Sequence, residues 1–231
     1  MLVGGLVKSS LIDYPKKIAA VVFLQGCNFS CPYCHNPEIV NPVVFKPFSE
    51  EEFFSFLKNR INKLDGVVIS GGEPTIHKDL YEFIKKIKDM GFLIKLDTNG
   101  TNPEILKKLI KDKMLDYIAM DIKAPFDEYE TVTRRKVNTD NIKESLNIIN
   151  RGFADYEFRT TVVKGLLTFD SFVKINDSFK EMKKIKRYYL QKFQKSKHLD
   201  ESYENRTTFE DEEFLKLEKL FSDTVEFFMV R

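Results

Sequence analysis

The 231-residue sequence contains no tryptophan, three histidines and three cysteines. Its 37 lysine and arginine residues nearly balance 35 aspartate and glutamate residues, which leaves a formal net charge of +2. This balance gives no electrostatic reason to expect nucleic acid or an anionic membrane as a partner. No apolar run approaches the roughly 18 residues of a membrane-spanning helix, and the first residues lack the pattern of a secretion signal. We therefore expect a cytoplasmic protein.

Apolar residues make up 42% of the chain and charged residues 31%, which is typical of a globular protein rather than a disordered one. The length allows one sizeable core. We expect a single domain over residues 1–231, with its core at about 15–193 and a C-terminal extension at about 194–231. The polar stretch at about 194–208 is either a surface loop or a functional lid.

The three cysteines are Cys27, Cys31 and Cys34, within eight residues. An odd number of thiols this close together is a poor disulfide framework and indicates a metal. A four-iron cluster usually takes four thiolates, so three leave one iron open to a small molecule. The alternative is a zinc site with His35 as fourth ligand. Because the adjacent residues Cys34 and His35 coordinate one ion poorly, the spacing favours the cluster.

Continuous apolar, β-branched runs recur along the chain, with amphipathic segments between them. Such runs are typical of strands covered on both faces. Strands that alternate with helices predict a parallel sheet with right-handed crossovers. Six units are too few for an eight-fold barrel, so we expect an α/β fold with an open, partial (β/α)6 barrel. The predicted strands are Ala19–Leu24, Val67–Ser70, Phe92–Asp97, Tyr117–Ile122, Glu157–Val163 and Arg187–Phe193.

Capping patterns mark where helices begin. Ser49, three residues before Glu52, forms a capping box at the start of an apolar helix. The other predicted elements are a helix capped by Asn102 with Pro103 in its first turn, a helix that starts at Thr139 or Asp140 and ends at Gly152, a helix near Glu210–Phe221, and a strand at Val225–Val230.

Polar clusters follow four of the predicted strands. The cysteine loop follows the first strand, Gly71–Pro74 the second and Asp97–Gly100 the third, while Asp121–Lys123 ends the fourth. In parallel barrels the chemistry collects at the C-terminal ends of the strands. We therefore expect all four clusters at the same rim.

Each cluster also has a structural interpretation. Two adjacent glycines commonly make a tight turn, but glycine also lets backbone approach a ligand, and Glu73 can accept a hydrogen bond from an ammonium group. The Asn-Gly pair after Asp97 is a common turn, yet a helix start follows it instead of a hairpin strand. Asp97 and Asp121 would repel each other unless a cation lies between them. Lys123 or a bound cation could serve.

Several other polar residues have two interpretations. Arg159 lies inside an apolar strand, so it either pairs with an acid such as Glu157 or points toward the site. His77 and His198 are predicted to be surface residues. A basic run is either a solvated face or a docking site for an acidic electron donor; it comprises Lys183, Lys184, Lys186, Arg187, Lys192, Lys195 and Lys197.

Taken together, these motifs resemble the radical S-adenosylmethionine (SAM) superfamily. The cysteine spacing, with Tyr33 before the last cysteine, resembles its cluster signature, and Gly-Gly-Glu resembles its methionine-binding motif. The resemblance implies one [4Fe–4S] cluster on the three cysteines, a bound SAM and a 5′-deoxyadenosyl radical. The implied SAM-binding residues are Tyr33, His35, Gly71, Gly72, Glu73, Asp97, Asn99, Asp121, Lys123, Arg159 and Gln191, and an implied monovalent cation site comprises Asp97, Thr98 and Asp121.

Within that superfamily the chain resembles the glycyl-radical-enzyme activating enzymes from about Leu6 to Phe193, and it differs from those members that carry additional ferredoxin-type cysteines. Leu11–Pro15 resembles the branch of anaerobic ribonucleoside-triphosphate reductase activating proteins. The resemblance implies removal of a glycine Cα hydrogen from a partner glycyl radical enzyme, with flavodoxin or ferredoxin as electron donor. The alternatives are an enzyme that acts on a small molecule, similar to the deazaguanine-forming enzymes, and a zinc-binding interaction module.

Overall fold

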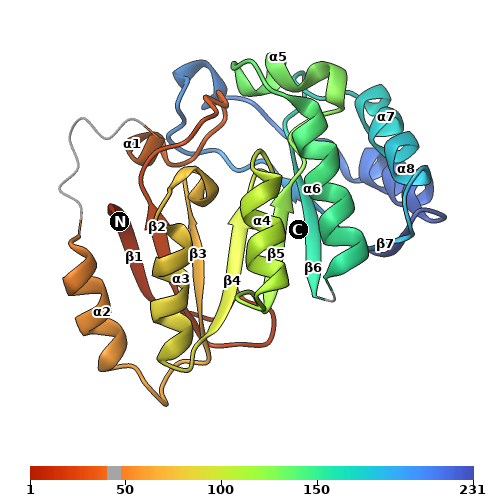
Figure 1. Ribbon diagram of the computed structural model, residues 1–231. Coiled ribbons are helices and arrows are strands. Elements are labelled where there is room, and N and C mark those ends of the chain that lie inside the picture. The colour runs from red at the N-terminus through yellow and green to blue at the C-terminus, as the bar shows by residue number, and fades with distance from the viewer. Residues whose placement is uncertain (41–47, 154) are drawn as a thin grey trace. The chain divides into compact units, whose positions relative to one another are not determined.

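A computed structural model describes residues 1–40, 48–153 and 155–231. The strands are β1 (Val3–Ser10), β2 (Ala19–Leu24), β3 (Gly66–Gly71), β4 (Leu93–Thr98), β5 (Tyr117–Asp121), β6 (Tyr156–Val162), β7 (Ile185–Lys192) and β8 (Val225–Val230). They are hydrogen-bonded neighbours in chain order, in an α/β fold (Figure 1). The strand β1 is antiparallel to β2, whereas the pairs β2–β3, β3–β4, β6–β7 and β7–β8 are parallel.

The α-helices are α1 (Pro37–Val40), α2 (Glu50–Lys58), α3 (Leu80–Asp89), α4 (Pro103–Lys111), α5 (Tyr129–Thr133), α6 (Thr139–Gly152), α7 (Phe169–Lys180) and α8 (Asp211–Phe221). The short 3-10 helices are η1 (Pro74–Ile76), η2 (Phe126–Glu128) and η3 (Glu201–Tyr203). In the part of the chain that the structure describes, none of the helices has both the length and the apolar composition needed to cross a bilayer.

The chain divides into two compact units. The first comprises Met1–Asn28, Glu38–Thr98 and Asn102–Ala119, and the second comprises Phe29–Pro37, Asn99–Thr101 and Met120–Arg231. The strand β5 begins in the first unit and ends in the second.

The first unit contains β1 to β4 with α2, α3 and α4. Its strands β2 and β3 are buried along nearly their whole length, as their uninterrupted apolar sequences require. Tyr14 and Tyr117 pack against Val21 and Val68 at the centre of one cluster, with the two tyrosine rings 5.9 Å apart. Helices α3 and α4 lie together over β3 and β4 (Figure 1).

The second unit contains β6 to β8 with α5 to α8, and its core is largely aromatic. Tyr188 lies edge-on to Phe179 and Phe221, at centroid distances of 5.2 and 5.0 Å. Its buried hydroxyl donates to Thr160 Oγ1 over 2.7 Å. A tyrosine buried this deeply normally needs such a partner, so the hydroxyl pair fixes β7 against β6.

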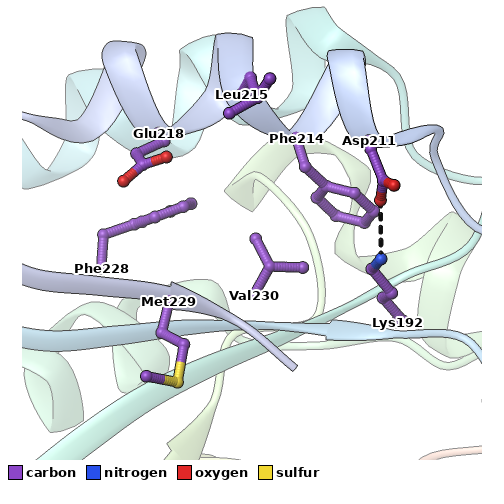
Figure 2. Close-up of a pocket in the computed structure, with 8 residues that line it drawn as sticks. All are labelled: Lys192, Asp211, Phe214, Leu215, Glu218, Phe228, Met229 and Val230. Atoms are coloured by element: carbon purple, nitrogen blue, oxygen red, sulfur yellow. Dashed lines mark hydrogen bonds and ion pairs between the residues drawn. The ribbon is translucent and has the colours of Figure 1, made fainter.

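A groove of about 440 Å³ lies between α8 and β8 in the second unit (Figure 2). Its walls are mainly apolar and include Leu215, Phe228 and Met229. At one end, the ion pair between Lys192 Nζ and Asp211 Oδ1 spans 2.8 Å. Leu215 and Met229 are exposed, so the groove opens to solvent.

The predicted fold class is confirmed, and β2 to β7 match the six predicted strands to within two residues. The prediction of a parallel sheet is wrong at β1, which the sequence analysis did not place. Its sequence, with two adjacent glycines, has no clear strand periodicity. Pairing with the buried strand β2, rather than local propensity, makes it a strand.

The helix starts are mostly as predicted. The capping box of Ser49 and Glu52 is present at α2. Helix α6 starts at Thr139 and ends at Gly152, as predicted, and the side chain of its cap residue Asn138 accepts from the Asp140 amide over 3.1 Å. Asn102 makes no side-chain cap at α4, because its side-chain amide donates to the Thr75 carbonyl. Helices α3 and α7 were not placed from the sequence.

Candidate functional site

The cysteine loop begins in the first unit, directly after β2. Gly26 has a φ of +90°, which favours glycine, and its amide donates to the Ile39 carbonyl over 2.9 Å. The half-buried Cys27 follows. The end of β2 and this glycine therefore fix where the first thiol lies.

The other two cysteines belong to the second unit, where the loop forms a tight turn. The Cys34 amide donates to the Cys31 carbonyl over 3.0 Å. Burial raises the pKa of the Cys31 thiol to about 11, although the nearby Lys123 charge opposes the shift. A thiol with this pKa is protonated at neutral pH. It becomes a thiolate when a metal supplies compensating positive charge.

Tyr33 is 4% exposed, between two of the cysteines in the sequence. Burial raises its pKa well above the ordinary value. Within the described parts of the chain, its buried hydroxyl has no hydrogen-bond partner. Native proteins rarely leave such a group unpaired unless a ligand or water satisfies it. The residue that we predicted to contact the cofactor thus has an unused polar atom.

Residues 194–203, which we call the strap, hold the second half of the cysteine loop. The Leu199 amide donates to the Cys34 carbonyl over 3.1 Å, and the Asp200 amide donates to the Pro32 carbonyl over 3.0 Å. Arg134 and Asp200 form an ion pair of 2.6 Å. The strap thus contacts the part of the loop that carries Cys34. The sequence predicts this stretch as either a surface loop or a functional lid.

One prediction in this region is wrong. His198 in the strap is 3% exposed instead of lying on the surface. Its ring stacks on the ring of Phe193, with the ring centroids 4.7 Å apart, and its centroid also lies 4.7 Å from that of the His35 ring. His35 Nδ1 and Ser196 Oγ are hydrogen-bonded at 2.8 Å. No local sequence pattern indicates this burial, because the rings that cover His198 come from β7's end and from the cysteine loop.

The Gly-Gly-Glu turn packs directly against the start of the cysteine loop. The Glu73 amide donates to the Gly26 carbonyl over 2.9 Å. A Cβ atom on Gly72 would lie 1.9 Å from that carbonyl oxygen, and one on Gly71 would lie 2.3 Å from backbone atoms of Leu24. These glycines are therefore required by close backbone packing within the protein, besides any approach to a ligand.

The Glu73 carboxylate is 1% exposed and is held by hydroxyl groups. Its Oε1 accepts from the Thr75 amide at 3.0 Å, from Thr75 Oγ1 at 2.5 Å and from Thr98 Oγ1 at 2.7 Å. Three donors fix the carboxylate in one orientation. Thr98, which we predicted as a cation ligand, thus orients Glu73, and sequence reasoning missed Thr75.

Asp97 at the end of β4 has partners in its own unit. Lys95 Nζ lies 2.5 Å from Asp97 Oδ1, and Ser70 Oγ donates to Asp97 Oδ2 over 3.3 Å. Lys95 is 3% exposed in an otherwise apolar strand. Residues two apart lie on the same side of a strand, so Lys95 and Asp97 can pair. As for Arg159, a charged residue beside apolar strand residues predicts a nearby acid, and this signal could have found Lys95.

Asn99 and Gly100 form a turn in the short segment Asn99–Thr101 of the second unit. Asn99 Oδ1 accepts from the Thr101 amide and hydroxyl at 3.1 and 2.7 Å. Gly100 has a φ of +76°. A Cβ atom there would lie 2.0 Å from the end of Met120. The side chain of Asn99 therefore acts in the turn, as the structural interpretation of this motif predicts.

Asp121, Lys123 and Arg159 form one charged network in the second unit. Arg159 Nε lies 2.8 Å from Asp121 Oδ1, and Lys123 Nζ lies 3.1 Å from Asp121 Oδ2. Burial alone would raise the pKa of Asp121, but the two cations hold it well below its usual range. Arg159 also lies 3.9 Å from Glu157. It therefore lies between two acids, and Glu157 also pairs with Arg231 at 2.8 Å, so two cations face the carboxylate of Asp121.

Gln191 is half-buried in β7, in register with Thr161 of β6. His77 is also half-buried, where we predicted a surface residue. In the basic run, Lys186 and Arg187 lie 3.5 and 3.3 Å from Asp155, and Lys192 pairs with Asp211. Part of the run is therefore neutralised by neighbouring acids.

The residues of the cysteine loop fit an iron–sulfur cluster. Within the described ranges none of the three cysteines is in a disulfide, the buried Tyr33 hydroxyl has no hydrogen-bond partner, and Gly72 presents only backbone to Cys27. No three His, Cys, Asp or Glu side chains in the described ranges converge on one position suited to a single ion. A cubic cluster takes its thiolates at separate irons, so it does not require such convergence.

The family model described as the Radical SAM superfamily matches residues 21–175. A Methanocaldococcus jannaschii protein named "Putative glycyl-radical enzyme activating enzyme" is 36% identical over 100% of this chain and 95% of its own length. The pyruvate formate-lyase-activating enzyme of Streptococcus mutans is 28% identical over 81% of this chain and 77% of its own. SuiB of Streptococcus suis shares the fold, with a TM-score of 0.67 at 14% identity over 90% of this chain and 48% of SuiB.

The chain belongs to the radical SAM superfamily. It is therefore a radical SAM enzyme, of a class that uses a [4Fe–4S] cluster and S-adenosylmethionine. This membership also decides between the two metal sites that the cysteine spacing left open, in favour of the cluster.

Proposed function

We propose that this enzyme activates a glycyl radical enzyme by removing one Cα hydrogen from a glycine of that partner. The observation that carries the proposal is the similarity to the M. jannaschii protein over nearly the full length of both chains. A shared superfamily alone would require a match only in the cluster-binding part. A full-length match favours a shared kind of substrate, because the segments outside that part are retained as well.

Each predicted site residue has a role in this proposal. Cys27, Cys31 and Cys34 would hold the cluster, whose open iron would bind the methionine end of SAM. When bound, cluster and cofactor supply a primary carbon radical. Glu73, fixed by its threonine donors, would accept a hydrogen bond from the methionine ammonium group, with backbone of Gly71 and Gly72 beside it.

The charged network would bind the polar groups of the cofactor. Lys123 would bind the methionine carboxylate, and Asp97 would contact the ribose or the amino-acid end. Arg159 would hold Asp121 as a carboxylate, as its 2.8 Å contact permits. Tyr33 and His35 would line the adenine side, Gln191 would lie near it, and Asn99 would shape the turn.

A monovalent cation at Asp97, Thr98 and Asp121 stays a prediction. Each of the two carboxylates already has a cationic partner in its own unit, Lys95 for Asp97 and Lys123 with Arg159 for Asp121. Electrostatic balance therefore does not demand an added ion. Measuring SAM binding in potassium and in tetramethylammonium buffers would test it.

We propose anaerobic ribonucleotide reductase as the partner because Leu11–Pro15 resembles the sequence of its activating proteins. Leu11 and Ile12 are 74% and 89% exposed, whereas Tyr14 is buried. The lysines of the basic run that have no ion pair within the described ranges would favour an acidic electron donor such as flavodoxin or ferredoxin. A cytoplasmic compartment would keep the three thiols reduced.

The decisive experiment uses anaerobically reconstituted enzyme, SAM, a reductant and the candidate partner with its radical-site glycine deuterated at Cα. We expect a glycyl radical in the electron paramagnetic resonance (EPR) spectrum and deuterium in the 5′-deoxyadenosine. A partner with that glycine replaced by alanine is the control. If 5′-deoxyadenosine forms without deuterium or a protein radical for every glycyl radical enzyme of the same genome, the proposal is wrong and a small-molecule substrate takes its place.

A further inference from the structure

His198 is a buried imidazole whose two ring nitrogens both have no hydrogen-bond partner within the described parts of the chain. Its residue is 3% exposed. A neutral imidazole always has one N–H donor and one acceptor nitrogen. Leaving both unused in a buried position is costly, so the structure calls for a group that this ring can bind.

The strap places this ring next to the cysteine loop. The residue after His198, Leu199, donates its amide to the Cys34 carbonyl over 3.1 Å. The ring of His198 lies 4.7 Å from that of His35, the residue after Cys34. Leu199, next to His198 in the sequence, is hydrogen-bonded to Cys34, and His35, whose ring lies beside that of His198, directly follows Cys34. The ring of His198 is therefore close to the segment that carries Cys34.

The ring is also held rigidly. It stacks on Phe193 with an interplanar angle of 27°. On the other side of His198, Asp200 is fixed by Arg134 and caps the short helix η3 through Ser202. A ring fixed by packing and by backbone bonds on one side can direct a single N–H donor at low entropic cost.

We propose that His198 is a positioning residue for the cluster, whose ring N–H donates a hydrogen bond to a cluster sulfur on the Cys34 side. This inference rests on the cluster and not on the identity of the partner enzyme. A hydrogen bond to sulfur stabilises the more negative, reduced cluster, so it raises the reduction potential. It also secures the ligand loop through the strap.

The test compares His198→Phe, His198→Asn and His198→Gln with the wild-type enzyme, all reconstituted without SAM. The phenylalanine variant fills the space without a donor, while asparagine and glutamine restore a donor near Nδ1 and Nε2 respectively. Gln194→Ala, at an exposed and uncharged residue of the strap, is the matched control. Iron and sulfide content and the thermal midpoint identify any variant that does not fold or load.

For His198→Phe we expect a more negative midpoint potential, a changed EPR spectrum of the reduced cluster, and an affinity for the cluster about 10-fold lower in competition with an iron chelator, the lower end of what loss of such a partner costs. One of the two amide variants should restore the potential. The Gln194→Ala control should match wild type.

Two results would overturn the proposal. One is an unchanged potential and EPR spectrum in a well-loaded His198→Phe enzyme. The other is an unchanged potential and spectrum together with weaker SAM binding when SAM is then titrated into the same enzymes, which would show that the ring binds the cofactor and not the cluster. Neither readout uses a partner protein, so a failure of glycyl-radical activation leaves this test unaffected.

Discussion

At the scale of single residues, the charged network of the second unit shows how a carboxylate is kept ionised. Asp121 accepts from both Arg159 and Lys123, and these cations outweigh the effect of burial on its pKa. A carboxyl whose pKa is lower in the folded protein than in the unfolded chain stabilises the fold above the unfolded pKa of about 3.9. That stabilisation disappears as the pH falls toward the folded value.

The Asp121→Asn variant should therefore lose about 2 kcal/mol of unfolding free energy at pH 7, the scale of a hydrogen bond to a charged group. The loss should shrink as the pH is lowered below about 4, where the Asp121 carboxyl of the unfolded chain begins to be protonated while that of the folded protein stays ionised. Urea unfolding at pH 7, 5, 4 and 3 measures both effects. Asp140→Asn, at an exposed ion pair, serves as the control and should change little at any pH.

An equal difference between Asp121→Asn and wild type at every pH would contradict this account. The stabilisation would then come from packing of the side chain, not from its charge.

At the scale of elements, two loops at the ends of β2 and β3 are joined by backbone contacts. The Gly72 amide donates to the Leu24 carbonyl over 3.0 Å, and the Glu73 amide donates to the Gly26 carbonyl. Only a residue without a Cβ atom fits between them. This contact fixes Glu73 relative to Cys27, so the turn and the first residues of the cysteine loop are held together within the first unit.

Gly72→Ala should push these loops apart, because its Cβ atom would lie 1.9 Å from the Gly26 oxygen. We expect a loss of about 1–3 kcal/mol, as for other overpacked sites, and a lower iron content after reconstitution. Gly152→Ala is the matched control, since no atom of the described residues lies within 4 Å of its Cβ position. Thermal unfolding and iron analysis measure the two effects, and full stability with full cluster loading in Gly72→Ala would contradict the steric argument.

At the scale of the whole molecule, stability rests on cores made by residues distant in sequence. In the second unit Phe179 of α7 contacts Phe158, Tyr188 and Phe221, which come from β6, β7 and α8. These elements cannot be held together by local propensity, because each is short. Burial of large apolar area is the dominant favourable term.

Phe179→Ala should cost about 3–5 kcal/mol, the usual range for a fully buried phenylalanine. Phe169→Ala in the same helix is the control, because that ring is 43% exposed, and it should cost less than about 1 kcal/mol. Chemical denaturation of both variants provides the comparison. Similar losses for the two would mean that helix α7 contributes through its own propensity and not through the aromatic core.

The sequence by itself determined the features that depend on a few neighbouring residues. The cysteine spacing indicated a cluster, and the continuous apolar runs predicted β2 to β7. Ser49 and Glu52, three residues apart, predicted their own capping box. In each case the residues that form the pattern lie within one loop, one strand or one helical turn. The structure that they predict therefore does not depend on a contact with a distant part of the chain.

Only the tertiary structure decided which distant groups meet. His35 contacts Ser196 and His198 far along the chain, Arg159 pairs with Asp121, and Glu73 accepts from Thr98. Several residue types could satisfy each of these groups, and the choice depends on which strand ends the chain brings together. For this reason the burial of His198 was missed, although the nearby cysteines were identified at once.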